Sequence, residues 1–231
     1  MKYFKPLVAA ALAVSIAGCA TDDPNQRAKT GAVVGAVLGA VAGKQVSGAR
    51  GAPIVGAVVG AIAGGAVGNY MDKQHAQLQR DLAAEAARNE LQIIKLPGDA
   101  LKIGIASDVS FDLNSAQIRP EALNTYAKIA NILKTYDKTV IHIVGHTDTS
   151  GSAEHNQSLS ERRASAVASY EISQGLPAGR VREEGRGERE PLVRTADGVK
   201  EARNRRVDII IKPVIEGREQ EAWTPPPYLG G

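Results

Sequence analysis

The sequence contains a single cysteine, few aromatic residues and little net charge. In 231 residues there are one Cys, one Trp, six Tyr and two Phe, and the formal net charge is only +3. One cysteine cannot form a disulfide framework within the chain. So small a charge excludes the strongly basic composition of nucleic-acid-binding domains. The sequence therefore predicts no nucleic-acid partner.

Arrangements typical of enzymes and metal sites are also missing. The four histidines are scattered, and His142 and His146 on a predicted strand would lie about 13 Å apart, too far to share a metal ion. No Ser-His-Asp arrangement is identifiable, and no Gly-Lys-Ser/Thr follows Gly185-Arg186-Gly187-Glu188 to make a phosphate loop. Arg186 and its charged neighbours are expected to form a mixed solvated surface. The sequence predicts no catalysis, no metal and no cofactor.

The first 18 residues have the pattern of a secretory signal. Lys2 and Lys5 precede an apolar run, residues 7–16, which is shorter than the ~20 residues that span a bilayer. Ile16-Ala17-Gly18-Cys19 resembles a bacterial lipobox, in which the cysteine is acylated and becomes the new N-terminus. The residue after Cys19 is not the aspartate associated with inner-membrane retention. The resemblance therefore implies a lipid anchor at Cys19 in the outer membrane, followed by a polar tether over residues 19–30.

Glycine is concentrated in the next segment, where 11 of the 24 glycines lie between residues 31 and 68. They recur every four residues in two series, listed as Gly31, Gly35, Gly39 and Gly43, then Gly56, Gly60, Gly64 and Gly68. This spacing places them on one helix face, where a second helix can approach closely. We favour a membrane-associated glycine-zipper hairpin over residues 31–70. Self-association of soluble helices into a homo-oligomer and a flexible Gly/Ala spacer are the alternatives.

Residues 71–90 change to a charged, Ala-rich composition that favours helix. Leu78, Leu82 and Leu91 are interpreted as too sparse for a core, so this segment is predicted to be a helical linker. Residues 91–215 form the predicted folded domain, and residues 216–231 a flexible tail.

The domain reads as an α+β fold. The predicted elements are strands at 92–96 and 100–106, a helix from Pro120, a strand at 139–144, a helix opened by a Ser158/Glu161 capping box and ending near Gly175, and strands at Val181 and 207–211.

Polar residues capable of binding cluster after these strands. Asp148 leaves the end of the 139–144 strand and lies a short loop away from the second helix, so it can approach the first turns of that helix. Arg205 begins the last strand and by alternation shares a face with Val207, where a guanidinium needs an acceptor. Asp112, which follows an early strand, is one candidate acceptor.

These motifs together resemble the OmpA-like peptidoglycan-binding domain family over about residues 91–213. The matching residues, in order, are Phe111-Asp112, Gly145-His146-Thr147-Asp148 through Gly151, Asn156, Leu159-Ser160, Arg163-Ala164, Gly185 with Gly187, Pro191 and Asn204-Arg205-Arg206-Val207. The family fold is a mixed β-sheet with helices on one face. The layout of lipobox, glycine zippers and this domain resembles the YiaD-type outer-membrane lipoproteins. His155 and Glu171 depart from the family pattern, which implies altered packing.

The resemblance implies non-covalent binding of diaminopimelate in the peptide stem of peptidoglycan. Asp148 matches the family's aspartate and would receive the ammonium group, and Arg163 matches its arginine and would receive the carboxylate through a bidentate fork. Supporting positions are Asn114, Ser150, Asn156 and Arg205, and Asp112 would help to order the site. The alternatives are a structural salt bridge between Asp148 and Arg163, and an Arg205 that only orders Asp112 or Asp148.

The sequence thus predicts a non-enzymatic lipoprotein, anchored in the bacterial outer membrane through acylated Cys19, whose periplasmic domain tethers the membrane to the cell wall. The alternative is a glycine-zipper oligomer or envelope-assembly factor in which peptidoglycan binding only localises the protein.

Overall fold

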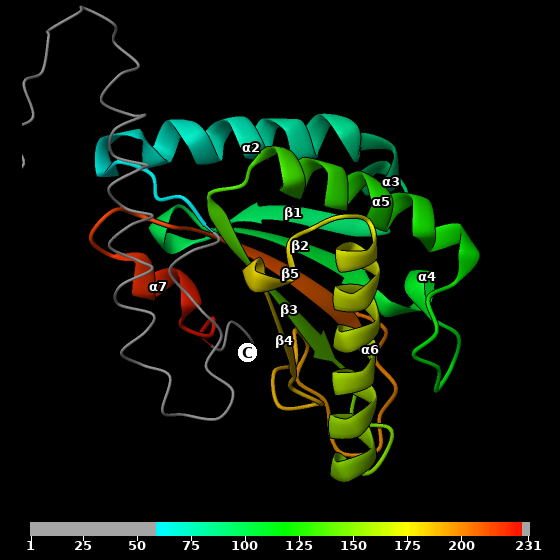
Figure 1. The fold of residues 1–231 in the computed structure, drawn as a ribbon. Coiled ribbons are helices and arrows are strands. Elements are labelled where there is room, and N and C mark those ends of the chain that lie inside the picture. Colours follow the sequence, from blue (N-terminus) through cyan, green and yellow to red (C-terminus); the bar gives the residue numbers. More distant parts are fainter. Residues whose placement is uncertain (1–58, 228–231) are drawn as a thin grey trace, which may run out of the picture.

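The computed structural model describes residues 59–227 (Figure 1). The signal, Cys19, the polar tether, the first glycine series and the end of the chain from residue 228 lie outside the described residues.

The domain is built on a five-stranded mixed sheet. The strands are β1 (Leu91–Lys95), β2 (Leu101–Ala106), β3 (Thr139–His146), β4 (Val181–Gly185) and β5 (Arg206–Pro213), in the spatial order β1-β2-β5-β3-β4. Neighbours are antiparallel except β3 and β4, which run parallel. The turn predicted at Pro97-Gly98-Asp99 is η2 and joins β1 to β2. This arrangement confirms the expected α+β fold.

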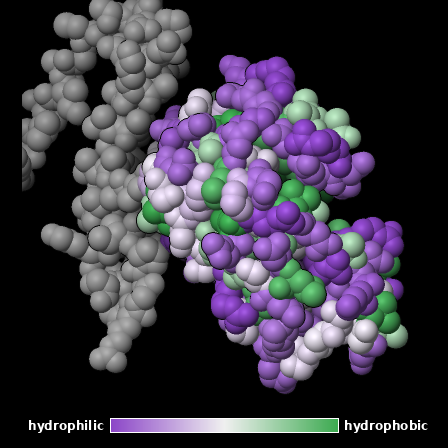
Figure 2. Space-filling view, turned by 90° about the vertical axis from the view of Figure 1, so that its right-hand side faces the viewer, coloured by the Kyte–Doolittle hydropathy of each residue, from purple (hydrophilic) through white to green (hydrophobic). Residues whose placement is uncertain are grey.

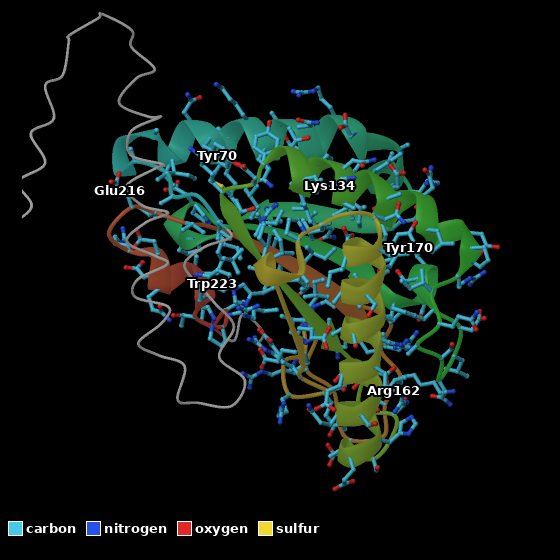
Figure 3. All side chains as sticks on the ribbon, in the orientation of Figure 1. Tyr70, Lys134, Arg162, Tyr170, Glu216 and Trp223 are labelled. Carbon is cyan, nitrogen blue, oxygen red and sulfur yellow. The ribbon has the colours of Figure 1, made fainter. Side chains whose placement is uncertain are left out.

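The main helices cover one face of the sheet. Helices α5 (Pro120–Thr135) and α6 (Ala153–Ser173) lie in front of the strands in Figure 1, and α2 (Val67–Asp81) runs beside α5. Alternate strand residues, including Ile103, Ile143 and Ile209, point toward these helices and are fully buried with Tyr126 and Leu133 of α5. Figure 3 labels Tyr70 of α2 and Tyr170 of α6, whose rings pack edge-to-face on Tyr136 and Tyr126.

Short elements complete the fold. They are η1 (Gly64–Ala66), α3 (Ala83–Ala87), α4 (Ser107–Ser110), η3 (Ala178–Arg180) and α7 (Glu219–Trp223). Of the helices in the described part of the chain, none is both long and apolar enough to span a membrane.

Two glycines let α6 lie directly on the sheet. A Cβ atom at Gly145 of β3 would overlap the backbone of Ser160, and one at Gly185 of β4 would lie 2.5 Å from the backbone nitrogen of Glu161. Any side chain at either position would therefore push α6 outward. This contact fixes the first half of α6 above the ends of β3 and β4.

The opposite face of the sheet carries buried charges. Arg186 and Glu190 are 2% and 3% exposed and form an ion pair of 2.7 Å, so the expected solvated surface is wrong for these two residues, whereas Glu183 and Arg189 are exposed. His146 contacts Asp208 at 3.4 Å on the same face, and His142 lies on it four residues earlier. Each histidine has its own protein partner, since the His142 ring contacts the Ala222 carbonyl.

The N-cap of helix α6 lies six residues before the predicted one, Ser158. The N-cap is Ser152, whose hydroxyl accepts a hydrogen bond from the His155 amide at 3.2 Å. Ser158 and Glu161 lie inside the helix, where backbone amides are already bonded within the helix, so they cap nothing. The predicted end is confirmed, because Gly175 follows the helix with a φ of +94°.

The segments flanking the predicted domain differ most from expectation. Leu78, Leu82 and Leu91 are 0–3% exposed, so the view that they are too sparse for a core is wrong. Residues 59–63 of the second glycine series are not helical, and Ile62 instead forms a bridge with Ile215. Residues 219–223 of the expected flexible tail form α7, whose Ala222 is 1% exposed because it packs on Val140 and Val214.

Candidate functional site

The predicted binding residues converge at one end of the sheet. Strand β3 ends at His146 and β2 at Ala106, and both of these residues pair with Arg206 at the start of β5. Asp148 therefore leaves the sheet beside Arg205, and α4 follows β2 at the same end. Helix α6 brings Arg163 to this point because α6 lies on Gly145 and Gly185.

Asp148 is 3% exposed and its carboxylate accepts four hydrogen bonds. Oδ1 accepts from the backbone amide and the hydroxyl of Ser150, at 3.1 and 2.6 Å. Oδ2 accepts from Nη1 of Arg205 at 2.6 Å and from the Glu201 amide at 3.2 Å. Burial alone would raise the pKa of Asp148, but these hydrogen bonds outweigh it and hold the pKa below its ordinary value. Asp148 is thus a fixed buried anion.

Arg163 is 4% exposed and is held by the turn at residues 112–115. Its Nε donates to the Ser115 carbonyl at 2.9 Å and its Nη2 to the Asp112 carbonyl at 3.4 Å. The guanidinium also lies over the Phe111 ring, 5.1 Å from its centroid. Burial lowers the pKa of Arg163 from its ordinary value. Its Nη1 is buried and has no hydrogen-bond partner among the described residues.

These contacts leave part of the guanidinium for a ligand. Nε and one N–H of Nη2 bond backbone carbonyls, whereas Nη1 has no partner among the described residues. Since Nη2 carries a second N–H, the bidentate fork expected from the sequence stays a prediction. The turn that holds Nε and Nη2 depends on Asn114, whose φ of +57° is a left-handed conformation that asparagine tolerates better than most residues.

Arg205 bridges two carboxylates. Its Nε and Nη2 donate to Oδ1 and Oδ2 of Asp108 at 3.0 and 2.6 Å, while Nη1 donates to Asp148. The contacts of Arg205 therefore agree with the alternative in which it orders Asp148. They do not include Asp112, the other acceptor considered. Asp108 escaped the sequence analysis because it is an exposed acid in the four-residue helix α4, with no periodicity or motif to mark it.

The remaining predicted residues take supporting places. Asn156 donates from Nδ2 to the Asp148 carbonyl at 3.1 Å and to Glu188 Oε2 at 2.5 Å, which ties the start of α6 to the loop after β3. The Asp112 side chain is 78% exposed and its nearest cation is Arg119, 3.8 Å away. Asp112 therefore contributes its backbone carbonyl to the site, and its carboxylate points elsewhere.

Asp148 and Arg163 come to the same end of the sheet without bonding each other. Within residues 59–227 the Asp148 carboxylate pairs with Arg205, and Arg163 forms no salt bridge. The salt bridge considered as an alternative is therefore not formed. What the site offers is a buried anion and a buried cation, each held separately by backbone and side-chain contacts.

The surface around the site is polar. The side of the molecule that carries α4 and α6 is mainly hydrophilic in Figure 2, with apolar residues in small separate patches. Leu113 lies at the tip of the turn that holds Arg163. At 80% exposed, it is the most exposed large apolar residue in the described part of the chain. Among the described residues, no group of three His, Cys, Asp or Glu side chains could hold a metal ion.

Comparison with family models gives two matches that divide the chain. The model of the OmpA family matches residues 110–205, and that of the YMGG-like Gly-zipper matches residues 1–72. The first match contains Asp112, Asp148, Arg163 and Arg205, and the second contains both glycine series.

Curated relatives match part of the chain. The chain is 36% identical to the probable lipoprotein YiaD of Escherichia coli K12, over 65% of this chain and 66% of that protein. It is 35% identical to the outer-membrane lipoprotein YfiB of Pseudomonas aeruginosa, over 58% of this chain and 80% of that protein. Outer membrane protein A of Bordetella avium is 37% identical, and the chain spans 58% of its length. The chain thus covers less than two thirds of some of these relatives.

A solved structure supports the same fold. The cell wall anchor of the T6SS from Pseudomonas aeruginosa superimposes with a TM-score of 0.53 at 29% identity, covering 59% of this chain and 96% of that one. A MotB-like protein from Desulfovibrio vulgaris, at 21% identity and a TM-score of 0.56, shows the fold alone.

Proposed function

The chain belongs to the OmpA family, and from that premise we propose that it binds peptidoglycan without covalent chemistry and tethers the outer membrane to the cell wall. Relatives named as outer-membrane lipoproteins and a structural neighbour named as a cell wall anchor support this role in the envelope. The proposed ligand group is the diaminopimelate residue of the peptide stem.

The observation that carries the proposal is the pair formed by Asp148 and Arg163. The free end of diaminopimelate is a zwitterion, so a receptor must supply one anion and one cation at a fixed separation. Asp148 is the buried anion, and Nη1 of Arg163 is a buried cationic donor without a partner in the described residues. Leaving such a donor unsatisfied is costly, which favours a ligand oxygen at this position. The proposal needs no catalytic group.

Sedimentation with purified peptidoglycan sacculi tests the proposal. The full chain in detergent is expected to sediment with sacculi, and Asp148→Asn or Arg163→Lys to weaken binding about tenfold or more, because each removes a charge-assisted bond. Lysine is not expected to replace Arg163, because its three donors lie on a single nitrogen and cannot reach the separate positions that Nε, Nη1 and Nη2 occupy. Arg162→Lys is the matched control, because Arg162 is exposed on the same helix and bonds only Ser158 in the described structure (labelled in Figure 3). Unchanged sedimentation of both site variants would refute the assignment.

We also propose that Cys19 carries the lipid anchor and that the domain faces the periplasm. The lipobox-like Ile16-Ala17-Gly18-Cys19 and the relatives named as lipoproteins support this. A Cys19→Ala chain is expected to lose the acyl mass in mass spectrometry and to leave the membrane fraction. Retention of both would contradict the anchor.

The match to the YMGG-like Gly-zipper favours a second candidate function, in which the zipper oligomerises or assists envelope assembly and the domain only localises the protein. Deleting residues 31–58 discriminates the two, because it leaves the described residues intact. Loss of oligomers or of the cellular phenotype with sacculus binding unchanged would favour the second candidate.

A further inference from the structure

The Asp148 carboxylate has no acceptor position to spare. A carboxylate offers about four lone-pair sites, and all four are used by Ser150, Glu201 and Arg205. A ligand ammonium that approaches Asp148 must therefore replace one of these donors. The two backbone amides cannot leave without moving the loops that carry them, which leaves the Ser150 hydroxyl and Nη1 of Arg205.

Arg205 is the donor that can be released at small electrostatic cost, because a second carboxylate holds it. Nε and Nη2 make a bidentate fork with Asp108, so Arg205 keeps a carboxylate partner if the planar guanidinium, and Nη1 with it, shifts away from Asp148. The exposed fraction of the side chain increases from Asp148 (4%) to Arg205 (21%) to Asp108 (56%). The Asp148 carboxylate is thus buried, whereas the Asp108 carboxylate faces solvent.

We propose that Asp108 is a positioning residue for ligand binding, which keeps the Arg205 guanidinium paired so that Asp148 can exchange Arg205 for the ligand's ammonium group. This inference rests on the proposed function and adds to it a residue that does not touch the ligand. The helix that carries Asp108 is fixed beside Arg205 by a hydrogen bond from the Ser107 amide to the Arg205 carbonyl, 2.9 Å long.

The charges of the site agree with this role. Asp108 and Asp148 balance Arg163 and Arg205, so the charges of these four side chains sum to zero, which suits a zwitterionic ligand group. Without the Asp108 charge the site gains one net positive charge, and Asp148 becomes the sole carboxylate partner of Arg205 in the described structure. The ligand's ammonium group then competes for Asp148 with a guanidinium that has no second carboxylate partner, and the added positive charge repels the ammonium group.

Affinity for meso-diaminopimelate, measured by calorimetry on the full chain in detergent, tests the proposal, with sacculus sedimentation as a second readout. Asp108→Asn is expected to weaken binding about fivefold or more, because it removes the fork's charge. Asp108→Glu keeps the carboxylate and is expected to bind within about threefold of the wild type. Asp72→Asn is the matched control, since Asp72 is an exposed acid paired with Lys95 on another part of the molecule.

A double-mutant cycle separates positioning from a general structural effect. If Asp108 acts through Arg205, adding Asp108→Asn to an Arg205→Gln chain should change affinity less than about twofold. An equal loss in both backgrounds, wild-type affinity of Asp108→Asn, or failure of Asp108→Glu to restore binding overturns the proposal. These outcomes are distinct from failure of the proposed function, in which the wild type and Asp148→Asn bind equally or not at all, and which overturns both.

Discussion

At the scale of single residues, Glu171 is an acid in the packed layer between α6 and its neighbours. It is 0% exposed, and neither carboxylate oxygen has a hydrogen-bond partner among the described residues. Burial raises the pKa of Glu171 well above its usual value, against a smaller opposing effect of Lys134. The folded protein therefore holds a proton on Glu171 that the unfolded chain releases above pH 4.5. Stability is lost as the pH rises past that value.

Replacing Glu171 with Met is therefore expected to stabilise the protein, and more so at high pH. The free energy of unfolding should rise by about 2 kcal/mol or more at about pH 8 and by less at about pH 5, because an unpaired acid is removed from the interior. Urea denaturation at the two pH values measures the difference. Glu154→Met, at an exposed position of α6, should change stability by no more than about 0.5 kcal/mol. A gain independent of pH, or a loss, would contradict this interpretation.

The same scale shows which site residues could be predicted. Asp148 and Arg163 stand in motifs at a strand end and on the following helix, and the structure brings both to one end of the sheet. The partners that decide their chemistry could not be read from spacing. Asp108 lies 97 residues from Arg205, and the two carbonyls that occupy Arg163 are backbone groups, which carry no sequence signal.

At the scale of elements, α7 is held to the outer face of the sheet by a histidine. Nε2 of His142 donates to the Ala222 carbonyl at 2.7 Å, and the next residue, Trp223, lies over the Arg182 guanidinium at 4.4 Å (labelled in Figure 3). Burial lowers the pKa of His142 to about 4; the hydrogen bond to Ala222 and the charge of Glu184 oppose this shift, and the cations of Lys212 and Arg182 add to it. The docked state of α7 therefore favours a neutral His142.

Acidification is expected to release α7. When α7 leaves and exposes His142, the pKa of His142 is expected to rise toward its ordinary value of 6.5, so the undocked form binds more protons between pH 6.5 and about 4. Docking therefore weakens as the pH falls through this window, by at most about 3 kcal/mol. Trp223 is the single tryptophan of the chain, so its emission should shift toward that of a solvent-exposed indole. His142→Gln keeps a neutral donor, and a transition unchanged in that variant would contradict the mechanism.

Element boundaries show where local patterns were sufficient. Pro120 correctly predicted the start of α5, and Gly175 the end of α6, because both residues act through fixed backbone conformations. The start of α6 was placed late because two serines, Ser152 and Ser158, can both cap a helix, and only Ser152 precedes it. Helix α7 could not be predicted, since its short sequence gains stability only from the surface beneath it.

At the scale of the whole molecule, residues 59–90 are part of the domain and not a free linker. Leu78 and Leu82 are 0% exposed, and Tyr70 accepts a hydrogen bond from the Lys138 amide at 3.0 Å. The amide of Ile62 donates to the Val214 carbonyl at 2.7 Å, beside the apolar contacts of α7. The composition of residues 71–90 suggested a spacer because this segment has few apolar residues. However, their spacing brings them against α5 or the sheet, so a few apolar residues are enough to pack the segment on the domain.

A chain that starts at residue 91 is therefore expected to be much less stable than one that starts at residue 59. It loses the burial of five apolar side chains, listed as Ile62, Val67, Met71, Leu78 and Leu82, each contributing about 1.5–3 kcal/mol. The difference in unfolding free energy should be about 4 kcal/mol or more, or the shorter chain should fail to fold. Urea denaturation of the two chains measures it. Leu78→Ala in the longer chain should cost about 2–5 kcal/mol, whereas Gln79→Ala, on the exposed side of α2, should cost little. Equal stability of the two chains would mean that the contacts of α2 do not stabilise the domain.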